Sequence, residues 1–349
     1  MELTVDQREF QDLVASFLRE QVSSEYLRKR ITEKLDTDPA LVTRLAELGL
    51  SEGFCGAEAP FSVQELALVA AECGAVLMPE PISERLLCEG VLPRLLPEGE
   101  RDGYVKLLAG RKAALAPSEC CSLKLDAKGK VATGEISWCF GGVDADVVLA
   151  VAAGASGPRV AVFDVHGAGI TRTDLPSLDL TTALRGFSLK KAGCFLFSDE
   201  SSKLLLDLVE IIKSAEVFGL CKRVVDMTCE YVKTREQFGV PVGGFQAVQH
   251  KIVDCYAATE ALGSLVRFAA WSVEHSVEQR ALTARAAIAQ AAEVGPTVCE
   301  ASMQCHGGIG FTWEYDLHLY LRRAKVIQIA FPNSEARAAD LIQRAAARM

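Results

Sequence analysis

The carboxy-terminal part of the chain carries apolar residues at helical spacing over a long stretch with few helix breakers. One apolar stripe begins at Leu204 and continues to about Thr234. Further helical patterns run from about Phe245 to His275 and from about Arg280 to Met303. Long helices that follow one another directly are typical of a helical bundle. We therefore expect residues 201–349 to form such a bundle.

The two regions before the bundle differ from each other in their periodicity. Residues 1–110 show helical patterns, and Thr4 and Gln7 have the spacing of a capping box. Residues 111–200 instead alternate turn signals with short apolar runs, such as Val147–Val151 and Val160–Phe163. Because these strands do not alternate with helices, a doubly wound sheet and a β/α barrel are excluded. The sequence predicts an α+β fold: an N-terminal helical domain (1–110), a central β domain (111–200) and a C-terminal helical bundle (201–349).

Two more helices are expected in the first region. Leucines between Leu41 and Leu50 predict one helix that stops near Gly53. The run from Gln64 to Cys73 predicts another, which stops at Gly74.

Composition argues against several classes of protein. The net charge of −9 argues against nucleic acid as a partner, because phosphate binding needs a positive face. No stretch approaches the ~18 apolar residues of a membrane span. The first residues lack the basic start and apolar core of a secretory signal. The 12 cysteines show no metal-ligand spacing, so we expect reduced thiols, mostly in the core, in a cytoplasmic protein without a metal site.

Two segments of the bundle suit a phosphorylated cofactor. Arg235–Gly239 follows the first long helix, and Gln304–Phe311 ends the third. A guanidinium can hold a pyrophosphate through two parallel charge-assisted hydrogen bonds, and glycines allow the backbone to come close to a ligand. Taken alone, Arg235 is equally compatible with a cation at a helix carboxy terminus, and the glycines with a plain helix stop. We expect His306 to serve packing or solvation.

The ordered set of these segments, followed by Arg322–Lys325, resembles the acyl-CoA dehydrogenase family, and the resemblance covers nearly the whole chain. It implies FAD as cofactor, an acyl-CoA thioester desaturated between its α and β carbons as substrate, and a soluble electron-transfer acceptor. In the family, the matching residues hold the ADP half of the FAD of a neighbouring subunit. The residues that correspond here are Arg235, Gln237, Phe238, Gln304, Gly307 and Gly308.

The β region departs from the family pattern where the flavin ring should bind. Typical members have Thr-Glu-Pro and then Gly-Ser-Asp, whereas the matching stretch Ala113–Cys121 has lost most of these polar groups. Trp138 matches the aromatic residue that abuts the flavin, and is therefore predicted as a cofactor contact, with simple core packing as the alternative. Phe140 replaces a hydrogen-bonding threonine.

The catalytic base is also missing. Phe331 stands where many members carry the glutamate that removes the α-proton, and a phenyl ring cannot accept a proton. Other members place the base on an earlier helix, at the position of Val209. Glu210 is one residue further, which turns its side chain by roughly 100°. We therefore predict no catalytic residue in this chain and expect Glu210 to be a solvated surface carboxylate.

The loss of one half of a cofactor site and the retention of the other predict a subunit of a hetero-oligomer. We expect an α2β2 assembly with a homologous, longer dehydrogenase subunit. The run Phe311–His318 is similar to bacterial members of the family that act on bulky steroid side chains. Two alternatives stay open: a self-sufficient homo-oligomeric dehydrogenase with Glu210 as a displaced base, and a non-catalytic scaffold of the same fold.

Overall fold

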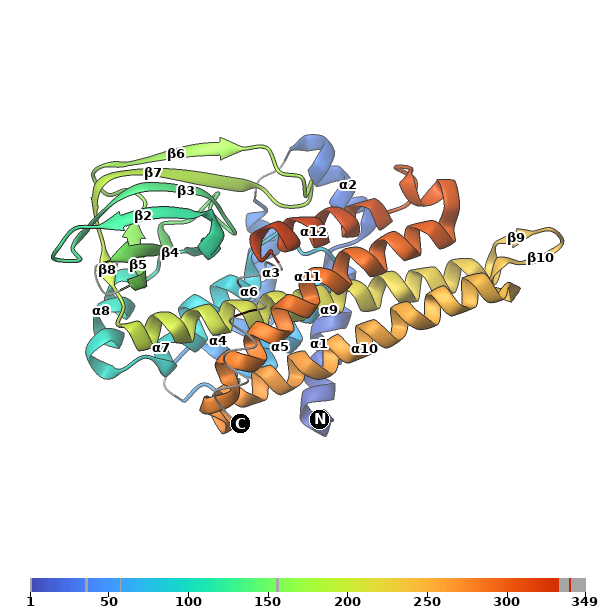
Figure 1. Ribbon diagram of the computed structural model, residues 1–349, viewed down its shortest axis with the longest axis horizontal. Coiled ribbons are helices and arrows are strands. Elements are labelled where there is room, and N and C mark those ends of the chain that lie inside the picture. Colours follow the sequence, from blue (N-terminus) through green and yellow to red (C-terminus); the bar gives the residue numbers. More distant parts are fainter. Residues whose placement is uncertain (1, 35–36, 57, 155–156, 333–338, 340–349) are drawn as a thin grey trace.

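The computed structural model describes residues 2–34, 37–56, 58–154, 157–332 and 339. A β-sheet lies at one end of a helical body, and the longest helix, α9 (Asp199–Thr234), runs from beside the sheet to the opposite end (Figure 1). Helices therefore come first, strands second and helices last, which confirms the α+β class. The end of the predicted bundle, residues 340–349, lies outside the described residues.

The first part of the chain is helical up to Leu108. The predicted capping box is confirmed, since Gln7 N donates to Thr4 Oγ1 over 3.2 Å and Thr4 N donates to Gln7 Oε1 over 3.1 Å. The helix expected up to Gly53 is divided in two, because Gly49 adopts a φ of +76° that an α-helix cannot contain. The helices are α1 (Val5–Gln21), α2 (Ser24–Glu33), α3 (Pro39–Glu47), α4 (Leu50–Phe54), α5 (Val63–Ala75), α6 (Ile82–Arg85), the π-helix η1 (Leu86–Val91), α7 (Leu92–Leu95) and α8 (Glu98–Leu108).

The strands form one eight-stranded sheet with the order β6-β7-β3-β2-β4-β5-β8, in which β1 also pairs with β4. Most neighbours are antiparallel, but β1 and β2 each run parallel to β4. One face of the sheet packs in a core of its own that includes Leu123, Ile136 and Phe163. The strands are β1 (Ala113–Leu115), β2 (Cys121–Leu125), β3 (Val131–Cys139), β4 (Val147–Gly154), β5 (Gly157–Asp164), β6 (Ile170–Leu175), β7 (Leu184–Gly193) and β8 (Phe195–Leu196), with the short 3-10 helix η2 (Ser118–Cys120) between β1 and β2.

The last part is dominated by three long helices, each within a few residues of its predicted bounds. α9 has 36 residues, and most of them are buried. Because the buried residues lie on every face of the helix, α9 forms the centre of the molecule. No helix in the described ranges is both long and apolar enough to cross a membrane. The elements are α9 (Asp199–Thr234), the hairpin β9 (Glu236–Gln237) and β10 (Val240–Pro241), the 3-10 helix η3 (Val242–Gly244), α10 (Gln246–His275), α11 (Val277–His306), the 3-10 helix η4 (Gly307–Phe311) and α12 (Leu317–Ala330).

Helices α5 and α9 cross with their backbones in contact. A Cβ atom added at Gly219 would lie 1.7 Å from Ala71 O, and one added at Gly74 would lie 1.9 Å from Glu216 O. Glycine is therefore required at both positions, and neither a side chain nor a ligand fits between the two helices here.

Candidate functional site

The residues predicted to hold the ADP half of FAD lie together at the end of the bundle opposite the sheet. The β9–β10 hairpin follows α9 and projects from this end, and η4 follows α11 at the same end (Figure 1). The hairpin segment carries Arg235, Gln237 and Phe238, and the junction of α11 and η4 carries Gln304, Gly307 and Gly308. Segments about seventy residues apart in the sequence thus meet, as the resemblance implies.

His306 and Tyr231 join the two segments. The Tyr231 hydroxyl donates to the His306 carbonyl over 3.3 Å, and the two rings stack with centroids 4.3 Å apart. His306 Nδ1 is hydrogen-bonded to Ser302 O at 2.8 Å. The side chain is buried, and burial lowers its pKa below the usual histidine value. The packing role predicted for His306 is confirmed.

The predicted contacts at this end face outwards. The Phe238 ring is 94% exposed, and Arg235, Gln237 and Gln304 are exposed as well. Gly307 has a φ of +65°, and a Cβ atom added at Gly307 or Gly308 would meet nothing within 4 Å. The backbone there is therefore open to a ligand that approaches from outside this chain.

The predicted flavin contact, Trp138, lies in β3 and is connected through Phe140 to the middle of α9. It is partly buried and packs edge-on against Phe140, with ring centroids 5.1 Å apart. The Lys213 ammonium of α9 lies 3.9 Å from the centroid of the Phe140 ring. From Lys213 to the end of α9 at Thr234 the helix spans about 30 Å. The two groups of predicted cofactor residues therefore do not form one continuous site within the described part of this chain.

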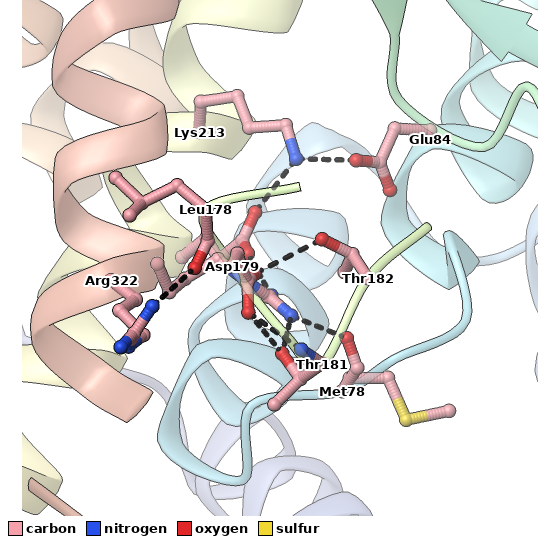
Figure 2. Close-up of polar contacts among 10 residues, drawn as sticks. Met78, Glu84, Leu178, Asp179, Thr181, Thr182, Lys213 and Arg322 are labelled. Carbon is pink, nitrogen blue, oxygen red and sulfur yellow. Dashed lines mark hydrogen bonds and ion pairs between the residues drawn. The ribbon is translucent and has the colours of Figure 1, made fainter. Parts of the chain in front are cut away.

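A cluster of buried charges occupies the interface between the sheet and the bundle beside Phe140. Lys213 pairs with Glu84 and with Glu216, the latter at 2.7 Å, and Arg323 pairs with Asp179 and with Glu216, the latter at 2.6 Å (Figure 2). We call these five residues the Lys213 cluster. None of their side chains is more than 7% exposed.

The charges of this cluster stabilise one another. Burial alone would raise the pKa of Glu216, but the positive charges of Lys213 and Arg323 outweigh burial and hold this pKa well below its usual range. Burial alone would lower the pKa of Lys213, but Glu216 and Glu84 raise it. Lys213 and Glu216 are therefore charged at neutral pH. The cavity beside them measures about 40 Å³, which is room for a few water molecules.

Phe331 stands where the resemblance places the base of the family. It is buried at the end of α12, where it lines a hollow of about 20 Å³ together with Pro117, Val209 and Glu210. The side chains around this hollow are mainly hydrocarbon, apart from those of Ser118 and Glu210.

The expectation that Glu210 is a solvated surface carboxylate is wrong. Its side chain is 6% exposed, and Oε1 lies 2.7 Å from the Arg285 guanidinium of α11. The reason is that α9 is covered on nearly all sides, so that a carboxylate on it needs an ionic partner rather than water.

Residues 211–346 match the family model of the acyl-CoA dehydrogenase C-terminal domain. Acyl-CoA dehydrogenase IpdE2 of Mycolicibacterium smegmatis is 29% identical over 321 residues, which cover 90% of each chain. Residues 211–346 thus match the C-terminal domain of the acyl-CoA dehydrogenase family, and the chain is similar to a member of that family over most of its length. Among solved structures, the fold is shared with the ChsE4–ChsE5 complex from Mycobacterium tuberculosis (TM-score 0.85, 24% identity, 99% and 98% coverage) and with the Tcur3481–Tcur3483 steroid ACAD (TM-score 0.83, 24% identity, 98% and 99% coverage).

Acyl-CoA dehydrogenases are FAD-dependent oxidoreductases that act on CH–CH bonds, and the two ends of this chain suit FAD unequally. At the hairpin end, an exposed guanidinium, two exposed amides and an open glycine backbone suit a pyrophosphate and its nucleoside. At the sheet–bundle interface, the hollows beside Phe140 and Phe331 are too small for three fused rings. The flavin ring of an acyl-CoA dehydrogenase therefore does not fit this chain's own interface as it stands.

The twelve cysteines are free thiols, and most of them are buried, as expected. The Lys213 cluster was not expected from the sequence. A signal was nevertheless present, since Glu210, Lys213 and Glu216 recur every three residues in the largely apolar middle of α9. Charges at that spacing in a helix that is buried on all sides must be paired inside the protein.

Proposed function

We propose that this chain is a subunit of an FAD-dependent acyl-CoA dehydrogenase and contributes the ADP-side contacts to the active site of a homologous partner subunit. One observation carries the proposal: the six ADP-side residues are exposed together at one end, whereas charges and Phe331 fill this chain's own sheet–bundle interface. The partner would supply both the flavin-ring contacts and the catalytic base.

The chemistry required of this chain is binding and orientation. Arg235 would donate to the pyrophosphate of FAD, and Gln237 and Gln304 would bind neighbouring polar groups, because an amide both donates and accepts. Phe238 would cover an apolar face, and Gly307 and Gly308 would let the ligand approach the backbone. When bound, FAD supplies the acceptor for the hydride that leaves the β-carbon of the acyl thioester.

The two structural relatives support the assembly and the class of substrate. Each of them has two named components, ChsE4 with ChsE5 and Tcur3481 with Tcur3483. By analogy we propose an α2β2 heterotetramer with one FAD per heterodimer. The description of the second as a steroid ACAD favours a steroid side chain over a short fatty acyl chain as the substrate. A soluble electron-transfer protein would reoxidise the cofactor, as in other members of the family.

The first test is the FAD content of the purified protein. Co-expression with a homologous subunit that retains the catalytic glutamate and the Thr-Glu-Pro motif is expected to give a yellow complex with one FAD for every two chains. The chain expressed alone is expected to be colourless. A pure homo-oligomer with one FAD per chain would contradict the proposal, and a colourless protein with every partner tried would favour the scaffold alternative.

The alternative of a self-sufficient dehydrogenase has one observation in its favour, since Glu210 lies beside Phe331 in the same hollow. We expect Glu210→Gln to leave the turnover of the assembled complex nearly unchanged, because the carboxylate is paired with Arg285 and belongs to a position next to that of the family base. If Glu210 were the base, turnover would fall by about 10²–10⁴-fold. The partner's catalytic glutamate, changed to glutamine, is the positive control.

Steady-state turnover is to be compared at equal FAD content, after thermal unfolding has shown that the variant is folded. This check is needed because the change removes a buried ion pair. A hundred-fold loss of turnover in a folded, FAD-loaded complex would establish Glu210 as the base and refute the subunit proposal.

A further inference from the structure

We infer that the Lys213 cluster takes the place of a flavin ring in this chain, closing its own sheet–bundle interface and holding the sheet to the bundle without a cofactor. This inference rests on the proposed function, in which the only FAD of the heterodimer lies in the partner's interface. It concerns residues to which the family resemblance assigns no role.

The position of the cluster is the first argument. Lys213 lies over the ring of Phe140, the residue that replaces the family's flavin-binding threonine. Phe140 in turn packs against Trp138, which matches the aromatic residue that abuts the flavin. The ammonium therefore lies on the residues expected to face the flavin ring. A cation above an aromatic face is itself stabilising.

The connectivity of the cluster is the second argument. Glu84 belongs to α6 in the first helical part, and Asp179 to the segment between β6 and β7. Lys213 and Glu216 belong to α9, and Arg323 belongs to α12. All three parts of the chain are thus joined by ion pairs at this interface (Figure 2).

The third argument is that the polar groups of the cluster are already bonded within the protein. Asp179 Oδ1 accepts hydrogen bonds from Thr181 N at 2.9 Å and Thr181 Oγ1 at 2.6 Å, and Oδ2 accepts from Thr182 Oγ1 at 3.1 Å as well as from Arg323. Arg323 Nη2 also donates to Thr181 Oγ1 over 2.8 Å and to Met78 O over 3.2 Å.

A flavin ring or an acyl chain would have to separate these ions. Such a separation leaves buried charges without partners, which is strongly unfavourable. The cluster therefore both fills the interface and excludes the ligands that the partner's interface must accept.

The holding role is tested with a matched pair of lysine variants in the co-expressed complex. Lys213→Met removes a buried cation, and the thermal midpoint is expected to fall by about 5 °C or more. Lys325→Met is the control, because Lys325 pairs with Glu300 at 2.9 Å at the surface, where the two side chains are 35% and 57% exposed. Its midpoint is expected to change by about 1 °C or less. Equal midpoints for the two variants would overturn the holding role.

The closure of the sheet–bundle interface is tested by fluorescence in complexes whose Lys213 cluster is intact. The emission of Trp138 is obtained as the difference between the wild-type complex and Trp138→Phe, each with and without FAD. We expect this difference to be unaffected by FAD, because no flavin ring enters this interface. Quenching of Trp138 by bound FAD would overturn the inference.

The FAD count is measured on the same samples and judges the proposed function separately. One FAD per two chains with equal midpoints for Lys213→Met and Lys325→Met would reject the holding role and keep the proposed function. One FAD per chain would reject the proposed function, whatever the midpoints are. Because the fluorescence test uses the intact cluster, it remains decisive if Lys213→Met does not assemble.

Discussion

Replacing Arg235 by alanine is expected to weaken the retention of FAD by the assembled complex by roughly ten- to hundred-fold. The reason is that a hydrogen bond from a guanidinium to a phosphate contributes about 1.5–3 kcal/mol. Arg235 is exposed at the end of α9 beside the hairpin, so the change leaves no cavity in the core. The dissociation constant of FAD is measured by flavin fluorescence during serial dilution.

Two controls separate a cofactor contact from a helix-terminal cation. Arg172→Ala removes an exposed arginine from β6, at the sheet end, and should leave FAD retention unchanged. Arg235→Lys keeps the positive charge but loses the planar guanidinium, which can donate two parallel hydrogen bonds. If Arg235 makes a bidentate contact with phosphate, this variant is expected to retain FAD better than Arg235→Ala and less well than wild type. If Arg235 served only the helix dipole, alanine would lower the thermal midpoint slightly and leave FAD retention unchanged.

Much of the fold could be predicted because its signals are local. The capping box of α1 and the stripe of α9 each lie within one segment, and each appears as expected. The division of the second helix was missed because the backbone conformation of Gly49 depends on packing around it. Boundaries of this kind follow from tertiary contacts rather than from local spacing.

The candidate site, like the fold, was predictable where its signals are local and not where they depend on tertiary contacts. The ADP-side residues form two short motifs, and the structure brings the motifs together. The Lys213 cluster draws its members from distant parts of the chain, namely Glu84, Asp179, Lys213, Glu216 and Arg323. Lys213 and Glu216 lie three residues apart, but no short spacing joins them to Glu84, Asp179 or Arg323. The error about Glu210 has the same origin, since burial of α9 on all sides follows from its neighbours. The partners of a buried charge become evident only in three dimensions.

Replacing Arg323 by methionine is expected to lower the free energy of unfolding by about 3–5 kcal/mol, because it breaks two buried ion pairs and leaves carboxylates behind in the interior. Asp179, one of these carboxylates, is fully buried. Arg322→Met is a closely matched control, because Arg322 is the neighbouring residue of the same helix and donates a hydrogen bond to Leu178 O at 3.3 Å near the surface. That variant should change stability by about 0.5 kcal/mol or less.

The pH dependence of stability provides a second test of the prediction for Arg323→Met. Glu216 has a folded-state pKa that is lowered from its ordinary value of 4.5, so its contribution to stability is fully present above that pH and is lost as the pH falls below it. The positive charge of Arg323 is responsible for part of this lowering of the Glu216 pKa. The difference in unfolding midpoint between wild type and Arg323→Met should therefore be largest near neutral pH and become smaller below about pH 4.5. Urea melts at several pH values measure it. Equal midpoints for Arg323→Met and Arg322→Met at neutral pH would mean that these ion pairs do not stabilise the interface.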